Sequence, residues 1–338
     1  MNKKTFRELV PESAEWQTFV DVLRSHAQSR GNEVAYVYLK DGETEGARIT
    51  FAELDAKVRA IAAKLQQSTC PGDRVLLMFA PGIEYISAYL GCLYAGVIAI
   101  PAYPPRNKRY LARFQSIVSD SQAAIGLTSS DLLPNIVTMF AQAQGLQMLK
   151  LISTDDMELS LADGWQTVDI SGATTAFLQY TSGSTGSPKG VIVSHGNLLH
   201  NEQVIVTHTD MAQSHGIVSW VPPYHDLGLI LGLLCPLYMG KKSVIMAPFA
   251  FIQSPYRWLK AISDFSDQKI CSGAPNFAYD LCSRRITAEQ KATLDLSHWD
   301  VAFNGAEPIS AQTYDRFVDA FAECGFQPNA RYPVYGLA

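Results

Sequence analysis

Residues 74–100 read RVLLMFAPGIEYISAYLGCLYAGVIAI and contain two apolar segments on either side of a longer one. Arg74–Ala80 is a short apolar stretch of the kind that forms a buried strand, and Val97–Ile100 is a second one. Between them, residues 82–94 have the length and composition of a helix. A strand, a helix and a second strand in this order form a parallel pair with a right-handed crossover. The run therefore predicts an α/β fold built on a parallel sheet.

The same run overlaps an uncharged stretch, Tyr85–Pro105, whose length would suit a membrane helix. Gly91 and Gly96 interrupt this stretch, and prolines occupy positions 101, 104 and 105 at its end. We therefore interpret it as a buried helix that turns into a buried strand, and we predict no transmembrane segment. The first residues, MNKKTFRELVPESAEW, are charged and lack the apolar core of a signal peptide.

Helix-like and strand-like segments alternate along the rest of the chain. Phe51–Leu65 has apolar residues at helical spacing, with Thr50 as a plausible N-cap. Further helices are predicted at 111–119, 131–144 and 256–264, and further strands at 124–128, 148–152 and 242–246. A polar, irregular stretch occupies 156–174. We expect two αβ subdomains, residues 1–170 and residues 171–338, the second incomplete at its end.

Composition narrows the possible classes of protein. The 27 basic and 32 acidic residues give a net charge of -5, whereas nucleic-acid-binding proteins usually have a basic excess. We therefore expect no nucleic-acid partner. The six cysteines are thinly spread and none forms a C-x-x-C pair, which disfavours a zinc site. Such cysteines are typical of reduced, packed thiols in a cytoplasmic protein.

The sharpest functional signal is the loop at residues 181–190, TSGSTGSPKG. Its glycines let backbone N–H groups approach an oxyanion, its hydroxyls donate further hydrogen bonds, and its lysine adds a positive charge. The expected ligand is a di- or triphosphate. The loop is not the P-loop of kinases and GTPases, because Lys189 lies three residues after Gly186. Apolar segments on both sides predict that it joins two antiparallel strands, although its composition alone also fits a flexible turn.

Three further motifs follow the loop. His225 lies in WVPPYHDLGL, residues 220–229, where Asp226 could either orient His225 or cap Gly228. NGAEP, residues 304–308, comes between an apolar segment and a predicted helix at 310–321. YGLA occupies residues 335–338. Taken alone, each motif also fits a structural role, namely a core histidine, a strand-to-helix turn and a packed tyrosine.

In their order and spacing these motifs resemble the acyl-adenylate-forming superfamily over nearly the whole chain, and YTSGSTGSPKGV resembles its phosphate-loop signature. The resemblance implies a layered αβ amino-terminal domain that stops before a small carboxy-terminal domain. It also implies ATP and Mg²⁺ as cofactors, with no metal ligand among the residues present. The implied catalytic residues are His225, Thr185 and Lys189. The implied nucleotide-binding residues are Thr181, Ser182, Gly183, Ser184, Gly186, Asn304, Gly305, Ala306, Glu307, Tyr335 and Gly336.

The segments PPYHDLGLI and SGAPNFAYDLC narrow the resemblance to fatty acyl-AMP ligases. This branch implies a fatty acid as substrate and an acyl carrier protein, or a carrier domain of a polyketide synthase, as acceptor. It implies an apolar acyl tunnel that includes Leu231, Phe277, Ala278 and Tyr279. A fatty acyl-CoA synthetase and a non-catalytic nucleotide- or acyl-binding fragment are the alternatives. Because the family's later elements are not in this sequence, we expect no turnover from the chain as given.

Overall fold

The computed structural model describes residues 15–105, 110–181, 188–265 and 269–336. These residues form two compact units, and each is described by itself. The seven-stranded unit contains Val34–Ile49 and the described residues from Asn201 onward. The six-stranded unit contains Glu15–Glu33 and the described residues of Thr50–His200. The predicted α/β fold class is confirmed.

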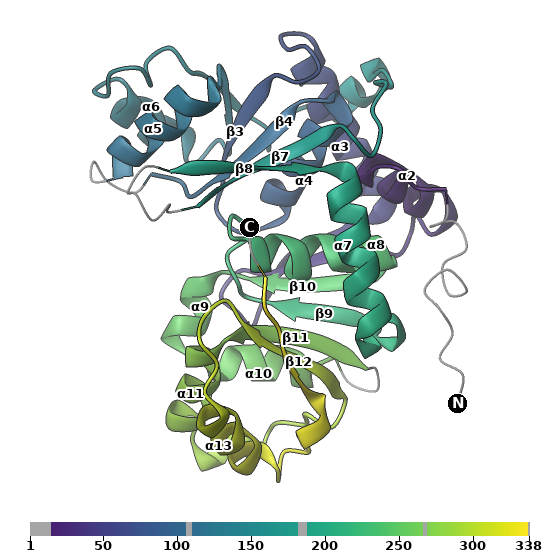
Figure 1. The fold of residues 1–338 in the computed structure, drawn as a ribbon, viewed down its shortest axis with the longest axis vertical. Helices are drawn as coiled ribbons and strands as arrows, with labels where there is room; N and C mark the ends of the chain where they lie inside the picture. The colour runs from purple at the N-terminus through teal and green to yellow at the C-terminus, as the bar shows by residue number, and fades with distance from the viewer. Residues whose placement is uncertain (1–14, 106–109, 182–187, 266–268, 337–338) are drawn as a thin grey trace. The chain divides into compact units, whose positions relative to one another are not determined.

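The six-stranded unit is built on a sheet with the order β6-β5-β3-β4-β7-β8 (Figure 1). Its neighbouring strands pair in parallel, except for β7 and β8, which form an antiparallel hairpin. β3 and β4 are the two strands predicted from the run 74–100, and they are neighbours in parallel as predicted. The strands are β3 (Arg74–Met78), β4 (Ile98–Ala102), β5 (Ile125–Thr128), β6 (Lys150–Ser153), β7 (Thr175–Thr181) and β8 (Lys189–Ser194).

Helices cover both faces of this sheet, and β3 is apolar and buried from Val75 to Met78. Leu76 and Met78 of β3 pack against α5 and α6 on one face. Val75 and Leu77 point to the opposite face, where α4 contacts β3 and packs against α3. Thr50 caps α3 in a capping box with Glu53, as its position in the sequence predicts. The helices are α2 (Phe19–Ser29), α3 (Phe51–Gln66), α4 (Ile83–Ala95), α5 (Leu111–Ser121), α6 (Leu133–Phe140) and the short 3₁₀-helix η3 (Leu159–Gly164).

Helix α6 is shorter than the predicted helix at 131–144. It ends at Phe140 because the chain then continues in single turns, in which the Ala143 N–H donates to Phe140 O and the Leu146 N–H donates to Ala143 O. Gly145, with φ of 85°, lies within these turns. The uncharged stretch 85–105 forms most of α4 and all of β4, as predicted. No helix in the described ranges has the length and apolarity needed to cross a membrane.

The seven-stranded unit is built on a second sheet, with the order β13-β12-β11-β9-β10-β1-β2. The pairs from β13 to β1 are parallel. The strands are β1 (Val34–Leu39), β2 (Glu45–Thr50), β9 (Gly216–Ser219), β10 (Lys242–Met246), β11 (Ile270–Pro275), β12 (Trp299–Gly305) and β13 (Arg331–Pro333). β10 has the predicted bounds, whereas the pair β1 and β2 was not predicted.

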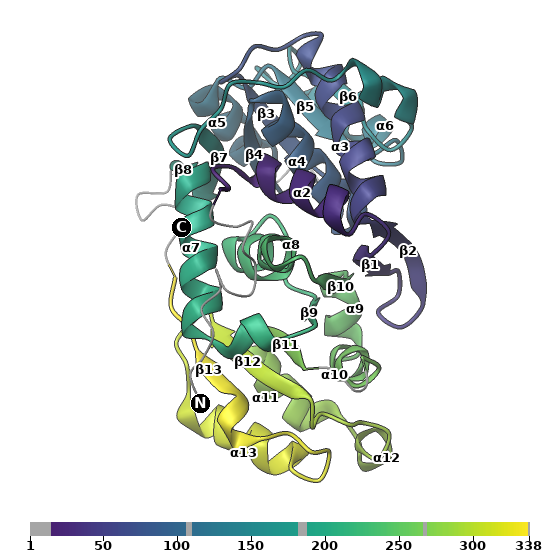
Figure 2. The same cartoon turned by 90° about the vertical axis from the view of Figure 1, so that its right-hand side faces the viewer.

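An aromatic core covers one face of the second sheet. Trp258, Tyr279, Trp299 and Phe317 pack together there from α10, α11, β12 and α13. Figure 2 shows α11 and α13 on one side of β11 and β12, and α8 on the other side, near β9 and β10. The helices are α7 (His195–His208), α8 (Cys235–Met239), α9 (Pro248–Gln253), α10 (Tyr256–Ser263), α11 (Asn276–Arg285), α12 (Ala288–Lys291), α13 (Ala311–Phe321), the 3₁₀-helices η4 (Asp210–Gln213) and η6 (Pro328–Ala330), and the π-helix η5 (Gly228–Leu234).

The compact units differ from the predicted subdomains 1–170 and 171–338. The hairpin of β7 and β8 completes the first sheet, because β7 pairs with β4. The early strand β1 belongs to the second sheet, because it pairs with β10. Helix α7 begins in the six-stranded unit and continues past His200 into the seven-stranded unit. Pairing between strands that are far apart in the chain leaves no local signal, so a division based on local composition does not reflect it.

The six cysteines are free thiols. Five are buried, as predicted, and burial raises the pKa of Cys92 and Cys282 above the ordinary range. The prediction of a packed thiol is wrong for Cys70, which is exposed in the turn before β3.

His195 begins α7 and is buried in the six-stranded unit, with 1% of its surface exposed. Its Nδ1 accepts a hydrogen bond from the Phe19 backbone N–H at 3.3 Å, which links α7 to α2. Burial lowers the pKa of His195 to about 4, and the nearby Asp21 carboxylate opposes this shift. At neutral pH the folded protein therefore holds a neutral imidazole at the start of α7.

We predict that the free energy of unfolding falls as the pH is lowered from about 6.5 to about 4. The unfolded chain protonates His195 near the ordinary histidine pKa, so acid favours the unfolded state over this range. Full loss of this contribution amounts to about 3 kcal/mol. Urea unfolding near pH 7 and near pH 4 measures it. His195→Gln should flatten the pH dependence, whereas His208→Gln, at an exposed position on the same helix, should not. An unchanged pH dependence in His195→Gln would contradict this assignment.

Candidate functional site

Four parallel strands of the seven-stranded unit end at one edge of their sheet (Figure 1). A segment with candidate site residues follows each strand. β9 leads to the 220–229 segment with His225, β11 to Phe277, β12 to Glu307, and β13 to Tyr335. The carboxyl ends of neighbouring parallel strands meet at the same edge, which is where open α/β sheets bind ligands. Residues that are far apart in the sequence are therefore brought to one place.

Asn304 and Gly305 form the buried end of β12. The Asn304 Nδ2 donates to Asn276 Oδ1 at 3.3 Å, whereas its Oδ1 is buried and has no hydrogen-bond partner among the described residues. A side chain at Gly305 would have its Cβ only 2.6 Å from a methyl carbon and 2.7 Å from the carbonyl oxygen of Val334. At this strand end, Val334 approaches the Gly305 backbone closely, and Asn304 Oδ1 is a buried hydrogen-bond acceptor. An exocyclic amine, such as that of adenine, would satisfy this acceptor.

Ala306 turns the chain away from the sheet at this point. Its φ of 64° lies in the left-handed region, which alanine rarely adopts. Beyond the turn, Glu307 Oε1 accepts a hydrogen bond from the Phe277 backbone N–H at 2.6 Å. That N–H belongs to the first turn of α11, which has no side-chain cap from Pro275. Glu307 therefore caps α11 and ties it to β12.

Tyr335 lies next to the end of β12. The Val334 N–H donates to Asn304 O at 2.8 Å, so the pairing of β13 with β12 continues to the residue before Tyr335. The Tyr335 side chain is 87% exposed and Gly336 after it is exposed as well. An exposed aromatic residue that follows a strand paired with the end of β12 could stack on a planar ligand that also reaches the Asn304 acceptor.

Asn276 is a site residue that the motif analysis missed. Its Oδ1 accepts from Asn304 Nδ2 at 3.3 Å and from the Ser310 backbone N–H at 3.1 Å. It thereby connects the end of β12 with the starts of α11 and α13. Its place, directly after Pro275 and at the start of a helix, was the available signal.

His225 lies in the turn that follows β9. Its Nδ1 is 2.5 Å from Asp226 Oδ1, and the Leu227 N–H donates to the same oxygen at 2.7 Å. Of the two roles left open for Asp226, the structure shows the first, which is to orient His225. The hydrogen bond that His225 donates to the Asp226 carboxylate raises the pKa of His225, although burial opposes the shift. This pairing occupies Nδ1, so Nε2 is the ring nitrogen that remains available to a ligand. The His225 side chain is 53% exposed.

Leu231 lines a small apolar cavity in the seven-stranded unit. It lies on η5, and the other lining residues include Leu227, Gly232, Ser219 and Phe303. The cavity measures about 10 Å³, which is about the space that one water molecule needs. An acyl chain would therefore enter only if the lining residues moved.

The other three predicted acyl-site residues lie elsewhere in the same unit. Phe277 is 42% exposed, with its ring centre 6.1 Å from that of Trp220. Ala278 and Tyr279 are fully buried, and the Tyr279 hydroxyl donates to Phe303 O at 2.5 Å. Both belong to the aromatic core, and neither lines the cavity at Leu231. Their role in acyl binding stays a prediction.

The glycine-rich loop is flanked by the hairpin of the six-stranded unit. Thr181, the last residue of β7, is paired with Lys189, the first residue of β8, and the Lys189 side chain is exposed. The predicted pair of antiparallel strands is confirmed. The predicted phosphate-binding residues between them lie outside the described residues; these are Ser182, Gly183, Ser184, Thr185 and Gly186.

Tyr180 anchors the base of this hairpin. Its hydroxyl donates to Asp120 Oδ2 of α5 at 2.5 Å, and its ring lies against Gly190, where a Cβ would be 3.0 Å from the ring. Burial and then Asp120 raise the pKa of Tyr180 above its ordinary value, so the phenol stays a protonated donor. The strands beside the loop are thereby fixed to the helical layer of their unit.

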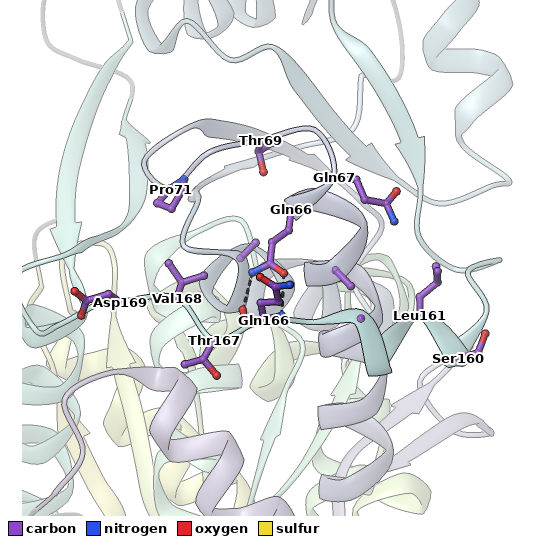
Figure 3. Close-up of a pocket in the computed structure, with 13 residues that line it drawn as sticks. Gln66, Gln67, Thr69, Pro71, Ser160, Leu161, Gln166, Thr167, Val168 and Asp169 are labelled. Carbon is purple, nitrogen blue, oxygen red and sulfur yellow. Dashed lines mark hydrogen bonds between the residues drawn. The ribbon is translucent and has the colours of Figure 1, made fainter.

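A separate groove of about 720 Å³ lies in the six-stranded unit (Figure 3). In its floor, Gln66 binds the Gln166 backbone through both amide atoms, at 2.8 Å and 3.1 Å. Asp169 is the one charged residue of its lining, which includes no motif residue. The groove therefore has no positively charged lining residue that would favour a phosphate ligand. In the described part of the chain, no cluster of three or more histidine, cysteine, aspartate or glutamate residues is placed to hold a metal ion.

Comparison with known proteins gives a consistent result. The AMP-binding enzyme family matches residues 23–338 of this chain. A medium-chain-fatty-acid–[acyl-carrier-protein] ligase of Moorena producens is 43% identical over 330 residues, which cover 96% of this chain and 55% of the relative. This chain thus spans about half the length of that relative.

Solved structures agree with the sequence relatives. The fatty acid AMP ligase from Legionella pneumophila matches with a TM-score of 0.90 and 45% identity, over 96% of this chain and 56% of that one. The fatty acyl-adenylate ligase from L. pneumophila in complex with acyl adenylate and pyrophosphate matches with a TM-score of 0.89 and 44% identity, over the same shares of the two chains. From the family match, these similarities and the motifs at the strand ends, we conclude that the chain belongs to the AMP-binding enzyme family.

Proposed function

We propose that this chain carries the nucleotide- and acyl-binding elements of a ligase that activates a fatty acid as acyl-AMP and passes the acyl group to an acyl carrier protein. The observation that carries the proposal is the gathering of His225, Asn304 and Tyr335 at the carboxyl ends of parallel strands. The similarity to a ligase crystallised with acyl adenylate and pyrophosphate supports it. Because the chain spans about half of such relatives, the activity is proposed for the protein that contains it.

Different residues would bind the adenine base and the phosphates of the nucleotide. Asn304 Oδ1 would accept a hydrogen bond from the adenine amine, and the exposed ring of Tyr335 would stack on the base. For the phosphates, the resemblance of the glycine-rich loop to the family's phosphate-loop signature favours Thr181, the loop itself and Lys189, an exposed positive charge. The buried, unsatisfied acceptor at Asn304 is the structural feature that favours a base with an exocyclic amine.

The reaction requires no nucleophile from the protein. A carboxylate oxygen of the fatty acid attacks the α-phosphorus of ATP, the bond from this phosphorus to the bridging oxygen breaks, and pyrophosphate leaves with the bonding electrons. Positioning and electrostatic stabilisation of the phosphate oxygens supply the catalysis. His225 would contribute its Nε2, because Asp226 holds Nδ1 and favours the protonated ring.

Magnesium would arrive with ATP and neutralise the phosphate oxygens during this step. It is usually held by phosphates, waters and one or two carboxylates. The described residues offer no acidic cluster for it, so we assign no metal ligand to this chain.

Two alternatives make different predictions. A fatty acyl-CoA synthetase would pass the acyl group to coenzyme A, and a non-catalytic binding fragment would release no pyrophosphate. The similarity to the acyl-carrier-protein ligase of Moorena producens favours the carrier protein as acceptor.

The test measures fatty-acid-dependent pyrophosphate release by the full-length natural protein, then acyl transfer to a carrier protein and to coenzyme A. We expect release of pyrophosphate and transfer to the carrier protein. Rapid acyl-CoA formation would favour the synthetase, and absence of pyrophosphate release would contradict the proposal.

We predict that Asp226→Asn weakens binding of an acyl-adenylate analogue mainly at high pH. Without the Asp226 carboxylate the pKa of His225 falls toward its ordinary value, so the ring loses its proton at a lower pH. The probe is 5′-O-(N-decanoylsulfamoyl)adenosine, whose acyl sulfamate stays anionic over the range. Calorimetry between about pH 6 and pH 9 should show the alkaline fall in affinity shifted to lower pH.

Asp264→Asn provides the matched control, because it removes an exposed carboxylate that pairs with Lys260 in the same unit. Its pH profile should coincide with that of the wild type. A profile of Asp226→Asn that also coincides with the wild type would show that His225 does not meet the anionic group as a cation.

We predict that Thr185→Val impairs pyrophosphate release more than Lys189→Ala. Thr185 lies outside the described residues, and its role rests on the resemblance of the loop to the phosphate-binding signature. A lost oxyanion donor typically costs about a hundredfold in rate. An exposed lysine contributes less because water screens its charge, so we expect a loss below about tenfold. Steady-state rates in the full-length protein decide between them, and the reverse ranking would indicate a fixed, buried lysine.

A further inference from the structure

The segment after His225 and Asp226 has an uncommon backbone. Gly228–Leu234 forms a π-helix that passes directly into α8. A π-helix makes i→i+5 hydrogen bonds and is rare, and it persists where tertiary contacts favour it over the α-helix. Its sequence, GLILGLL, contains apolar residues and glycine and no residue with a side-chain hydrogen bond. The contacts that maintain it must therefore come from other elements.

Two glycines let the π-helix lie close against the turn after β9. A Cβ at Gly228 would be 2.1 Å from the carbonyl oxygen of Pro222, and a Cβ at Gly232 would be 2.7 Å from the Ser219 hydroxyl. Any side chain at either position would push the helix away from the strand end. The π-helix is thus packed directly against the segment that carries His225.

Two hydroxyl groups hold its carbonyl oxygens from the sheet side. The Ser243 hydroxyl of β10 donates to Gly232 O at 2.8 Å, and the Tyr36 hydroxyl of β1 donates to Leu233 O at 2.7 Å. Both side chains are fully buried, at 0% and 1% exposure. Burial raises the pKa of Tyr36 far above its ordinary value, so the phenol remains a donor. Consecutive carbonyl groups of the π-helix are therefore fixed by neighbouring strands.

This fixed segment forms one wall of the cavity at Leu231. Leu227, Leu231 and Gly232 line it from the π-helix side, opposite Ile217 of β9 and Phe303 of β12. The cavity offers about 10 Å³ of space, and Leu231 is part of its wall. A change from π-helix to α-helix would shorten each hydrogen-bonded ring by one residue and move Leu231 relative to the sheet.

We propose that Tyr36 and Ser243 are positioning residues of the acyl site, which hold the π-helix so that Leu231 closes the pocket and limits the length of the acyl chain it accepts. This inference rests on the proposed function, because it names what sets the substrate class of that same site. Neither hydroxyl touches the substrate, since both act through the backbone of the π-helix.

The test measures binding of 5′-O-(N-acylsulfamoyl)adenosines with acyl chains of about 6 to 16 carbons, by calorimetry on the 338-residue chain. Each buried methylene changes affinity about fourfold. In Tyr36→Phe and in Ser243→Ala the helix can relax and Leu231 can withdraw. We expect the preferred chain to lengthen by about two methylenes, so that the affinity ratio of the longer to the shorter ligand rises about sixteenfold. Affinity for AMP should stay within about twofold of the wild type.

Two variants in the six-stranded unit are matched controls. Tyr94→Phe removes a buried hydroxyl that donates to Asp55, and Ser87→Ala removes a buried hydroxyl that donates to a helix carbonyl. Their chain-length profiles should equal that of the wild type. Ser243→Thr, which keeps the hydroxyl, should restore the wild-type preference if Ser243→Ala has lost it.

The outcomes separate this inference from the proposed function. Wild-type chain that binds neither AMP nor any of the acyl ligands contradicts the proposed function itself. Wild-type chain that binds them, with Tyr36→Phe and Ser243→Ala showing an unchanged profile, contradicts only the positioning role. A uniform loss of affinity for all ligands including AMP, or a preference for shorter chains, also overturns it, because each indicates general damage or an opposite movement of Leu231.

Discussion

The parallel pairing of β9, β11, β12 and β13 is the constraint on which the candidate site depends. It forces four segments that are spread over more than a hundred residues to leave the sheet at the same edge. The aromatic core beneath that edge fixes the strands, and the hydrogen bond from Val334 to Asn304 extends the last pair to the beginning of Tyr335. Without this pairing, His225, Asn304 and Tyr335 would be unrelated residues.

Several residues at this edge of the sheet have uncommon backbone conformations or unusually close backbone contacts. Ala306 adopts a left-handed conformation. Val334 lies so close to Gly305 that no side chain would fit at that position. The π-helix follows the turn that contains His225. Such conformations cost free energy and are maintained by surrounding contacts. Here the contacts are visible as the Glu307 cap on α11 and the two buried hydroxyls on the π-helix. The sheet supplies rigidity, and the strained segments shape the surface that would meet the ligand.

Local patterns in the sequence predicted much of this fold, and contacts between distant segments account for what they missed. The parallel pair from residues 74–100, the capping box at Thr50 and the hairpin beside the glycine-rich loop follow from short-range rules, and all three are present. The strands β1 and β2 join the second sheet through pairing with β10, about two hundred residues later, which no local pattern indicates. The π-helix is also invisible in GLILGLL, whose carbonyl groups accept hydrogen bonds from Tyr36 and Ser243 on other strands. Asn276 was missed for the same reason, since its partners come from β12 and α13.

We propose that the strand ends of the seven-stranded unit bind an acyl adenylate. A crystal structure of this chain with 5′-O-(N-decanoylsulfamoyl)adenosine would show whether they do. We expect the adenine ring to stack on Tyr335 with its amine at Asn304 Oδ1, and the acyl chain to run past His225 and end at Leu231. Density for the ligand in the polar groove beside Gln66, or adenine density away from the ends of β12 and β13, would contradict this assignment.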